Sequence, residues 1–281
     1  MAGVSTKEIK NRIRSMESTK QITKAMEMVA ASKLRRAQEQ VSNSRPYFNL
    51  LSNTITNIVR SNRDFSSPYL KTSTGGKVMY IVIAGDRGLA GGYNSNVLKM
   101  VMAEIQGKDA VVLPIGKKAV EYFKGRKIPA LTEAYAEVAD VSVGECFSIS
   151  KMLSKAYLNG EFDEVHIAYT NFGSVISQVP TTKQLLPLVL PENAEDVAYT
   201  SDFIFDPDSD AVINAVVPEY LGGIVYGAIC ESRASEQAAR RTAMDSATSN
   251  AEEMIADLSL KFNRARQAAI TNELIDIVAG S

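Results

Sequence analysis

Two long stretches without glycine, one at each end of the chain, constrain the fold most. Between residues 4 and 74 no glycine occurs. The residue pair Ser5 and Glu8 has the form of a capping box at a helix start, and apolar residues recur every three or four positions, as expected for an amphipathic helix. These apolar positions are Ile9, Ile13, Met16, Ile22, Met26, Val29, Ala30, Leu34, Ala37 and Val41. Pro46 predicts a kink or a local break in the helix.

The C-terminal stretch is predicted to form a second long helix. We expect it to run from Pro218, because proline is tolerated in a first helical turn, to about Ala279. Residues 219–279 would form a rod of roughly 90 Å at 1.5 Å per residue. Such a rod cannot bury itself against a compact domain. We therefore expect it to pair with the N-terminal helix as an antiparallel coiled coil; the alternative is that each helix packs separately in a bundle core. The apolar positions of this stretch are Ala247, Ala251, Met254, Leu258, Phe262, Ala265, Ala269, Leu274 and Ile277.

The distribution of charge favours association of the two ends. Residues 1–63 carry 12 Lys and Arg against 4 Asp and Glu, a net charge of +8, whereas residues 218–281 carry 6 against 9, a net charge of −3. Opposite net charges attract one another.

The middle of the chain has a different pattern. Apolar runs that are predicted to be strands alternate with helical patterns, which is typical of an α/β layer domain with a mostly parallel sheet. The fold class expected is α/β, with a Rossmann-like domain at 76–217 inserted between coiled-coil helices at 1–62 and 218–281. The expected strands are 77–85, 110–116, 164–170, one or two within 176–188, and 202–206; the expected helices are 96–105, 117–124, 143–158 and 209–216.

The segment "GDRGLAGGYN", residues 85–94, lies where a phosphate loop would connect a strand to a helix. A phosphate loop requires GxxxxGK[ST], and neither Gly85 nor Gly88 is followed by the necessary Gly-Lys pair. The fingerprint GxGxxG is also missing. We interpret the segment as a structural turn or a protein-contact loop. Its residues of interest are Asp86, Arg87, Gly88, Gly91, Gly92 and Asn94.

The sequence offers little for catalysis, for cofactors or for metal binding. His166 is the single histidine and lies in an apolar alternating run, where a structural strand residue is expected. Cys146 and Cys230 are far apart and predict neither a disulfide framework nor a zinc site. We expect no catalytic, cofactor or metal site. The basic "KLRRAQ" lacks aromatic interleaving, so nucleic-acid binding is not expected. No apolar run reaches the ~18 residues of a membrane span, and the N-terminus does not resemble a signal peptide.

Three separated segments resemble one family. "IRSMESTKQITKAMEMVAASKLRRAQ" and "SEQAARRTAMDSATSNAEEMIADLSLKFNRARQAAITNELIDIVAG" look like the two ends of the γ subunit of rotary ATP synthases. "GDRGLAGGYNSNV" resembles an internal motif of the same family, although Ala90 stands where that motif often has cysteine.

This resemblance implies a non-catalytic rotor subunit. In the family, the coiled coil stands inside a ring of three α and three β subunits, and the α/β domain at the foot contacts the ε subunit and the membrane c-ring. Proton flow turns this rotor, and the rotation couples proton flow to ATP synthesis or hydrolysis. The implied location is peripheral, on the cytoplasmic face of a bacterial cell membrane. By resemblance, the contacts with the αβ ring come from Lys24, Met26, Arg240, Arg266, Gln267, Thr271 and Glu273. Polar contacts that break and re-form would suit a turning tip better than a large apolar interface.

Two other functions remain open at this stage. A nucleotide-dependent α/β enzyme with helical arms would bind nucleotide through the glycine-rich loop. A coiled-coil scaffold would use its arms to dimerise two chains symmetrically, whereas a rotor subunit pairs its two ends within one chain.

Overall fold

The computed structural model describes residues 6–61, 67–70, 75–138, 141–188 and 208–279. The chain forms two compact units. The first, which we call the terminal pair, consists of residues 1–32 and 240–281. The second, which we call the body, consists of residues 33–239.

Helix α1 spans Thr6–Ser61 and contains Pro46. The predicted helix is confirmed, and it continues through the proline, although a proline removes one backbone hydrogen bond. The predicted capping residue Ser5 lies outside the described residues.

Helix α5 spans Ser209–Ala279 and is one helix of 71 residues. The prediction of a short helix at 209–216 followed by a new start at Pro218 is therefore wrong. The core contacts explain why the helix survives the proline: Ile213, Val217 and Leu221 are all buried. Their burial offsets the lost hydrogen bond.

Among its described residues, the body contains a four-stranded sheet in the order β2-β1-β3-β4. Strand β1 is parallel to β2 and β3, and β4 is antiparallel to β3. The strands are β1 Val78–Ile83, β2 Ala110–Ile115, β3 Glu164–Phe172 and β4 Gln178–Leu186. The helices of the sheet are α2 Tyr93–Glu104, α3 Lys117–Gly125 and α4 Val143–Leu158, with a short 3-10 turn, η1, at Pro68–Leu70. The α/β prediction is confirmed; the strand expected at 202–206 lies outside the described residues.

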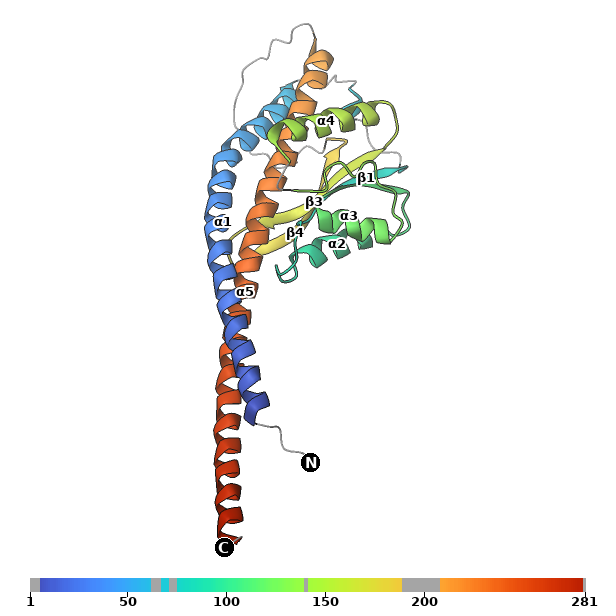
Figure 1. Ribbon diagram of the computed structural model, residues 1–281. Coiled ribbons are helices and arrows are strands. Elements are labelled where there is room, and N and C mark those ends of the chain that lie inside the picture. The colour runs from blue at the N-terminus through green and yellow to red at the C-terminus, as the bar shows by residue number, and fades with distance from the viewer. Residues whose placement is uncertain (1–5, 62–66, 71–74, 139–140, 189–207, 280–281) are drawn as a thin grey trace. The chain divides into compact units, whose positions relative to one another are not determined.

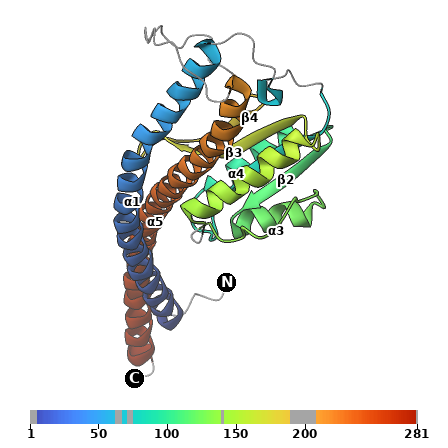
Figure 2. The same ribbon diagram turned by 90° about the horizontal axis from the view of Figure 1, so that it is seen from above.

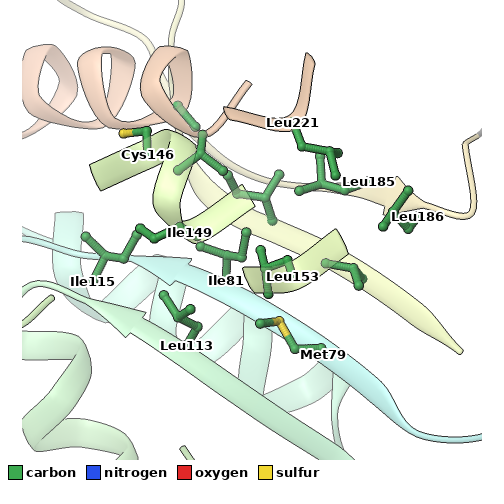
Figure 3. Packing of buried hydrophobic residues seen from close by; sticks show 14 of the residues in the cluster. Met79, Ile81, Leu113, Ile115, Cys146, Ile149, Leu153, Leu185, Leu186 and Leu221 are labelled. Atoms are coloured by element: carbon green, nitrogen blue, oxygen red, sulfur yellow. The ribbon is translucent and has the colours of Figure 1, made fainter. Parts of the chain in front are cut away.

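Alternating residues of β1 face two different cores. Figure 1 shows α4 on one side of the sheet and α2 and α3 on the other. Met79 and Ile81 pack with Ile149 and Leu153 of α4 and with the first part of α5 (Figure 3). Tyr80 points the other way and packs with residues of α2 and α3. Both faces of the sheet are covered, which is the usual arrangement for parallel strands.

Within the body, α1 and α5 run side by side in both views (Figure 2). A small apolar cluster joins them to the end of β3. It consists of Leu34, Ala37, Val41, Phe172, Cys230, Ala234 and Ala238.

The terminal pair is an antiparallel helix pair, as predicted. Thr23 of α1 contacts Thr248 of α5, with 2.8 Å between the hydroxyl oxygens. Three residues earlier in α1, the Lys20 ammonium lies 2.8 Å from the Glu252 carboxylate, four residues later in α5. The numbers rise on one helix and fall on the other, so the helices run in opposite directions. The Lys20 contact also lowers the pKa of Glu252.

Candidate functional site

The glycine-rich loop is a hydrogen-bonded turn between β1 and α2. The Gly85 amide donates to the Asn94 side-chain oxygen over 2.8 Å, and the Asn94 amide group donates to the Arg87 carbonyl over 3.1 Å. The Asp86 carboxylate accepts hydrogen bonds from the backbone amides of Lys117 and Val138. Asp86 and Asn94, both predicted from the sequence, therefore hold the loop in shape from opposite ends.

The surroundings of the loop disfavour a phosphate. A Cβ atom added to Gly85 would lie 2.9 Å from the carboxylate carbon of Glu236 on α5. A carboxylate at this distance repels an anion, and Asn94 already occupies the Gly85 amide. The interpretation of this segment as a turn, made from its glycine spacing, agrees with this geometry.

The tip of the loop is exposed and carries one residue that the sequence analysis did not single out. Arg87 and Gly88 are exposed, and Leu89 is 64% exposed. Leu89 has a φ of +61°, next to Gly91 at +55°. A left-handed leucine is unusual, and such backbone conformations gather at functional sites. Nothing in the sequence except an apolar residue in a glycine-rich turn could have drawn attention to it. Gly92 precedes the first residue of α2.

The predicted partner contacts of α1 lie on its accessible side. Lys24 is exposed, and its ammonium lies 2.7 Å from the Glu27 carboxylate. This hydrogen bond raises the pKa of Lys24. Met26 is half-buried. Two residues of the apolar repeat of this helix, Ile22 and Val29, are 59% and 55% exposed. The apolar residues of the repeat cover more of the helix surface than one partner helix can bury.

The predicted contacts of α5 are surface residues as well. Arg240 is half-buried, and Arg266, Gln267 and Thr271 are exposed. The Thr271 hydroxyl donates to the Gln267 carbonyl over 2.9 Å, one turn earlier. The side chain of Glu273 lies outside the described residues.

The end of α5 also exposes large apolar side chains. Leu274 and Ile277, which belong to the apolar repeat of this helix, are 58% and 69% exposed. The exposed apolar set at this end is Ile270, Leu274, Ile275, Ile277 and Val278.

The remaining sequence candidates have structural surroundings. His166 lies on β3, where Nε2 is 2.9 Å from the Glu164 carboxylate and the ring stacks on Tyr80. Burial raises the pKa of the Cys146 thiol to about 12 and also raises that of Cys230. Within the described ranges, no three His, Cys, Asp or Glu side chains are placed to hold a metal ion.

One described helix is long and apolar enough to cross a membrane, judged by length and composition alone. It is α5, and 44% of its most apolar stretch is buried inside the protein. A core helix passes the same test, and the first part of α5 is a core helix of the body.

Comparison with known proteins decides the family. A sequence profile of the family described as ATP synthase matches residues 5–281. The ATP synthase gamma chain of Ruminococcus albus is 44% identical over 282 residues, covering 98% of this chain and 97% of that one. The gamma chain of Heliobacterium modesticaldum is 43% identical over 286 residues, with coverages of 98% and 97%.

The chain belongs to the ATP synthase gamma-chain family. The resemblance drawn from its two ends and its glycine-rich loop is thereby confirmed. For this gamma chain, the nucleotide-enzyme alternative loses its basis, since a full-length family match accounts for the loop segment.

Two solved structures have a similar fold. A chain in the central stalk and c-ring of the Tetrahymena thermophila mitochondrial ATP synthase has a TM-score of 0.61 at 24% identity, covering 80% of this chain and 99% of that one. A chain in the Euglena gracilis mitochondrial ATP synthase, rotational state 3, has a TM-score of 0.64 at 18% identity, with coverages of 98% and 93%. These likenesses concern the fold.

Proposed function

We propose that this gamma chain is the non-catalytic central-stalk rotor subunit of an ATP synthase. It transmits torque between a membrane c-ring and a ring of three α and three β subunits, on the cytoplasmic face of the cell membrane. The body, with its α/β domain, contacts the ε subunit and the c-ring, and the terminal pair turns inside the αβ ring.

The observation that carries this proposal is the apolar end of α5. Lys20 lies opposite Glu252, and Thr23 lies opposite Thr248, so the numbers of two facing residues of α1 and α5 add up to about 271. The first described residue of α1, Thr6, therefore lies opposite a residue near 265. Residues 266–279 extend beyond it as a single helix.

A single helix of this length is marginal in water, and this one exposes Ile270, Leu274, Ile275, Ile277 and Val278. Exposed apolar side chains in such a group mark a contact with another protein. A surrounding sleeve of partner subunits provides that contact. Sequence analysis favoured polar contacts at the tip; the exposed side chains there combine polar residues with these aliphatic ones. We therefore assign Arg266, Gln267, Thr271 and Glu273 to the polar part of the same contact.

Two further surfaces belong to the same assembly. Lys24, Met26 and Arg240 of the terminal pair are also assigned to contacts with the αβ ring. The loop with Arg87 and Leu89 is assigned to a partner contact, because it presents one cation and one strained apolar residue on a rigid turn. The intrachain helix pair also favours a rotor subunit over a scaffold that dimerises through its arms.

The test is reconstitution with the cognate α and β subunits. We expect native mass measurement to find one copy of this chain per three αβ pairs, and sustained ATP hydrolysis only when the chain is present. A chain that neither joins the complex nor changes its turnover would overturn the proposal.

The tip contact is tested separately by replacing Leu274 and Ile277 with serine. We expect the αβ complex to bind this variant more weakly. The matched control replaces Lys261, an exposed residue that forms an ion pair with Asp257 within its own helix, by alanine. Equal binding of both variants and the wild type would contradict the role of the apolar tip.

A further inference from the structure

Glu231 of α5 lies where three elements of the body meet. Its carboxylate accepts a hydrogen bond from Arg45 of α1 over 3.4 Å and another from the side chain of Asn171 of β3 over 3.0 Å. The side chain of Glu231 is only 17% exposed. The same Arg45 nitrogen donates to the carbonyl of Phe172 over 3.1 Å. One carboxylate thus connects both long helices and the sheet.

The neighbouring contacts involve the backbone of β3. Strand β1 pairs with β3 only as far as Ala168, so the last residues of β3 extend beyond their parallel neighbour. Helix α5 contacts the edge of β3 there, where β1 no longer pairs with it. The Thr170 amide donates to the Ser232 hydroxyl over 3.2 Å, and the Ser235 hydroxyl donates to the Thr170 carbonyl over 3.1 Å. These two serines take the place of a neighbouring strand.

The apolar packing around these bonds is built from small residues. Ala37, Ala234 and Ala238 form much of the cluster between α1, α5 and the end of β3. Apolar contact resists separation of the helices but is not directional. The small side chains of the alanines do not interlock, so they hinder rotation of one helix past another only weakly. Hydrogen bonds have preferred angles. At this end of β3 they add a directional constraint to the apolar packing of Val217, Leu221 and Val225 of α5 in the core of the body.

We propose that Glu231 is a positioning residue for energy coupling: it holds the sheet of the body in a fixed orientation on α1 and α5, so that rotation of the body turns both helices. This inference rests on the proposed rotor function. The contacts that act with it, which we call the Glu231 joint, are those of Arg45, Thr170, Asn171, Glu231, Ser232 and Ser235.

The experiment uses the complete ATP synthase in inverted membrane vesicles, with this chain carrying Glu231→Ala. ATP hydrolysis and ATP-driven proton pumping are measured on the same vesicles, the latter by quenching of a pH-sensitive dye. We expect the number of protons pumped per ATP hydrolysed to fall below that of the wild type, while hydrolysis itself continues.

Three variants make the result specific. Glu231→Gln keeps one acceptor oxygen but replaces the other, which accepts from Arg45 or Asn171, by a donor NH2 group, so its ratio is expected to lie between those of Glu231→Ala and the wild type. Asn171→Ala removes one donor and is expected to give an intermediate ratio, which also tests the joint if Glu231→Ala fails to assemble. Glu219→Ala is the matched control, because Glu219 lies on the same helix in an exposed pair with Lys151 at 4.0 Å; its ratio is expected to equal that of the wild type.

The outcomes separate this inference from the rotor proposal. A pumping ratio in Glu231→Ala and Asn171→Ala equal to that of the wild type overturns the inference and leaves the rotor function intact. A wild-type chain that does not enter the complex overturns the rotor function itself. A merely structural role of Glu231 would lower the unfolding temperature without changing the ratio, which also overturns the inference.

Discussion

Replacing Thr23 or Thr248 by valine removes one of two buried hydroxyl groups between the helices of the terminal pair. The hydroxyls have three hydrogen-bond contacts: Thr23 with the Lys20 carbonyl at 3.1 Å, Thr248 with the Met244 carbonyl at 2.8 Å, and the two oxygens with each other at 2.8 Å. Two hydroxyls carry two protons, so only two of the three contacts are donated at one time. In either single variant the remaining hydroxyl still has a carbonyl within its own helix.

The expected change in the free energy of unfolding follows from these hydrogen bonds and from the methyl group that valine adds. Each variant loses one hydrogen bond worth about 0.5–1.5 kcal/mol net and gains a buried methyl group worth about 0.8 kcal/mol. We expect each single variant to change the free energy of unfolding by less than about 1 kcal/mol. The double variant, in which both partners become apolar, is expected to be neutral or more stable. If a single substitution instead left the other buried hydroxyl group without a hydrogen-bond acceptor, it would cost about 1–3 kcal/mol.

The assay is denaturant unfolding of the full chain, compared in a double-mutant cycle. Thr19→Val is the control, because Thr19 donates to the Ser15 carbonyl in the same way but is exposed; it is expected to change stability by less than about 0.5 kcal/mol. If Thr248→Val costs more than about 2 kcal/mol while Thr19→Val does not, the proton count is wrong.

Three further predictions concern the body. Gly222→Ala places a Cβ atom 2.4 Å from the Phe147 ring, so thermal unfolding should show a loss of about 1–3 kcal/mol. Gly125→Ala should not destabilise, because among the described residues its Cβ atom would meet no group outside its own stretch of helix within 4 Å; equal effects would contradict the close packing. Ser142 and Glu145 form a capping box that lowers the pKa of Glu145 in the folded protein. The Glu145 carboxylate therefore stabilises the fold above its unfolded pKa of 4.5, and this stabilisation is lost as pH falls through the folded pKa. The stability difference between wild type and Glu145→Ala, followed by circular dichroism, should therefore shrink on acidification, and a pH-independent difference would refute it. Burial of Cys146 and its raised pKa of about 12 predict that a thiolate-specific reagent labels neither cysteine at neutral pH until denaturant is added; rapid labelling of the native chain would count against the packing.

Local patterns predicted the elements well where one residue type decides the structure. The helix expected at 143–158 has those bounds, because Ser142 and Glu145 form its start through contacts three residues apart. The turn at Gly85–Asn94 was also predicted, since glycine and asparagine favour turns; the bonds from Lys117 and Val138 to Asp86 that hold it on the domain were not. The helix start expected at Pro218 is wrong, because the buried contacts of the neighbouring residues outweigh the local preference of proline.

The side of a helix that becomes buried was predicted less well. Ile22, Val29, Leu274 and Ile277 fit an apolar repeat as well as the residues that are buried, yet they are exposed. A repeat gives the angle of a residue around its helix but not the width of the partner that covers it. Only the structure of the helix pair shows which apolar residues the partner helix leaves exposed, and some of these form the proposed partner contact.

The amino-acid sequence by itself determined the long terminal helices, the α/β middle and the family, because these depend on periodicity and on motifs within short segments. The tertiary structure alone decided the Glu231 joint and the Thr23–Thr248 contact. Their partners are separated by 60 to 225 residues in sequence, and no local pattern relates residues that only folding brings together. A glutamate, a serine or a threonine on a long helix looks the same in sequence whether it faces water or a strand edge, and the difference arises from which backbone groups the rest of the fold leaves without a partner.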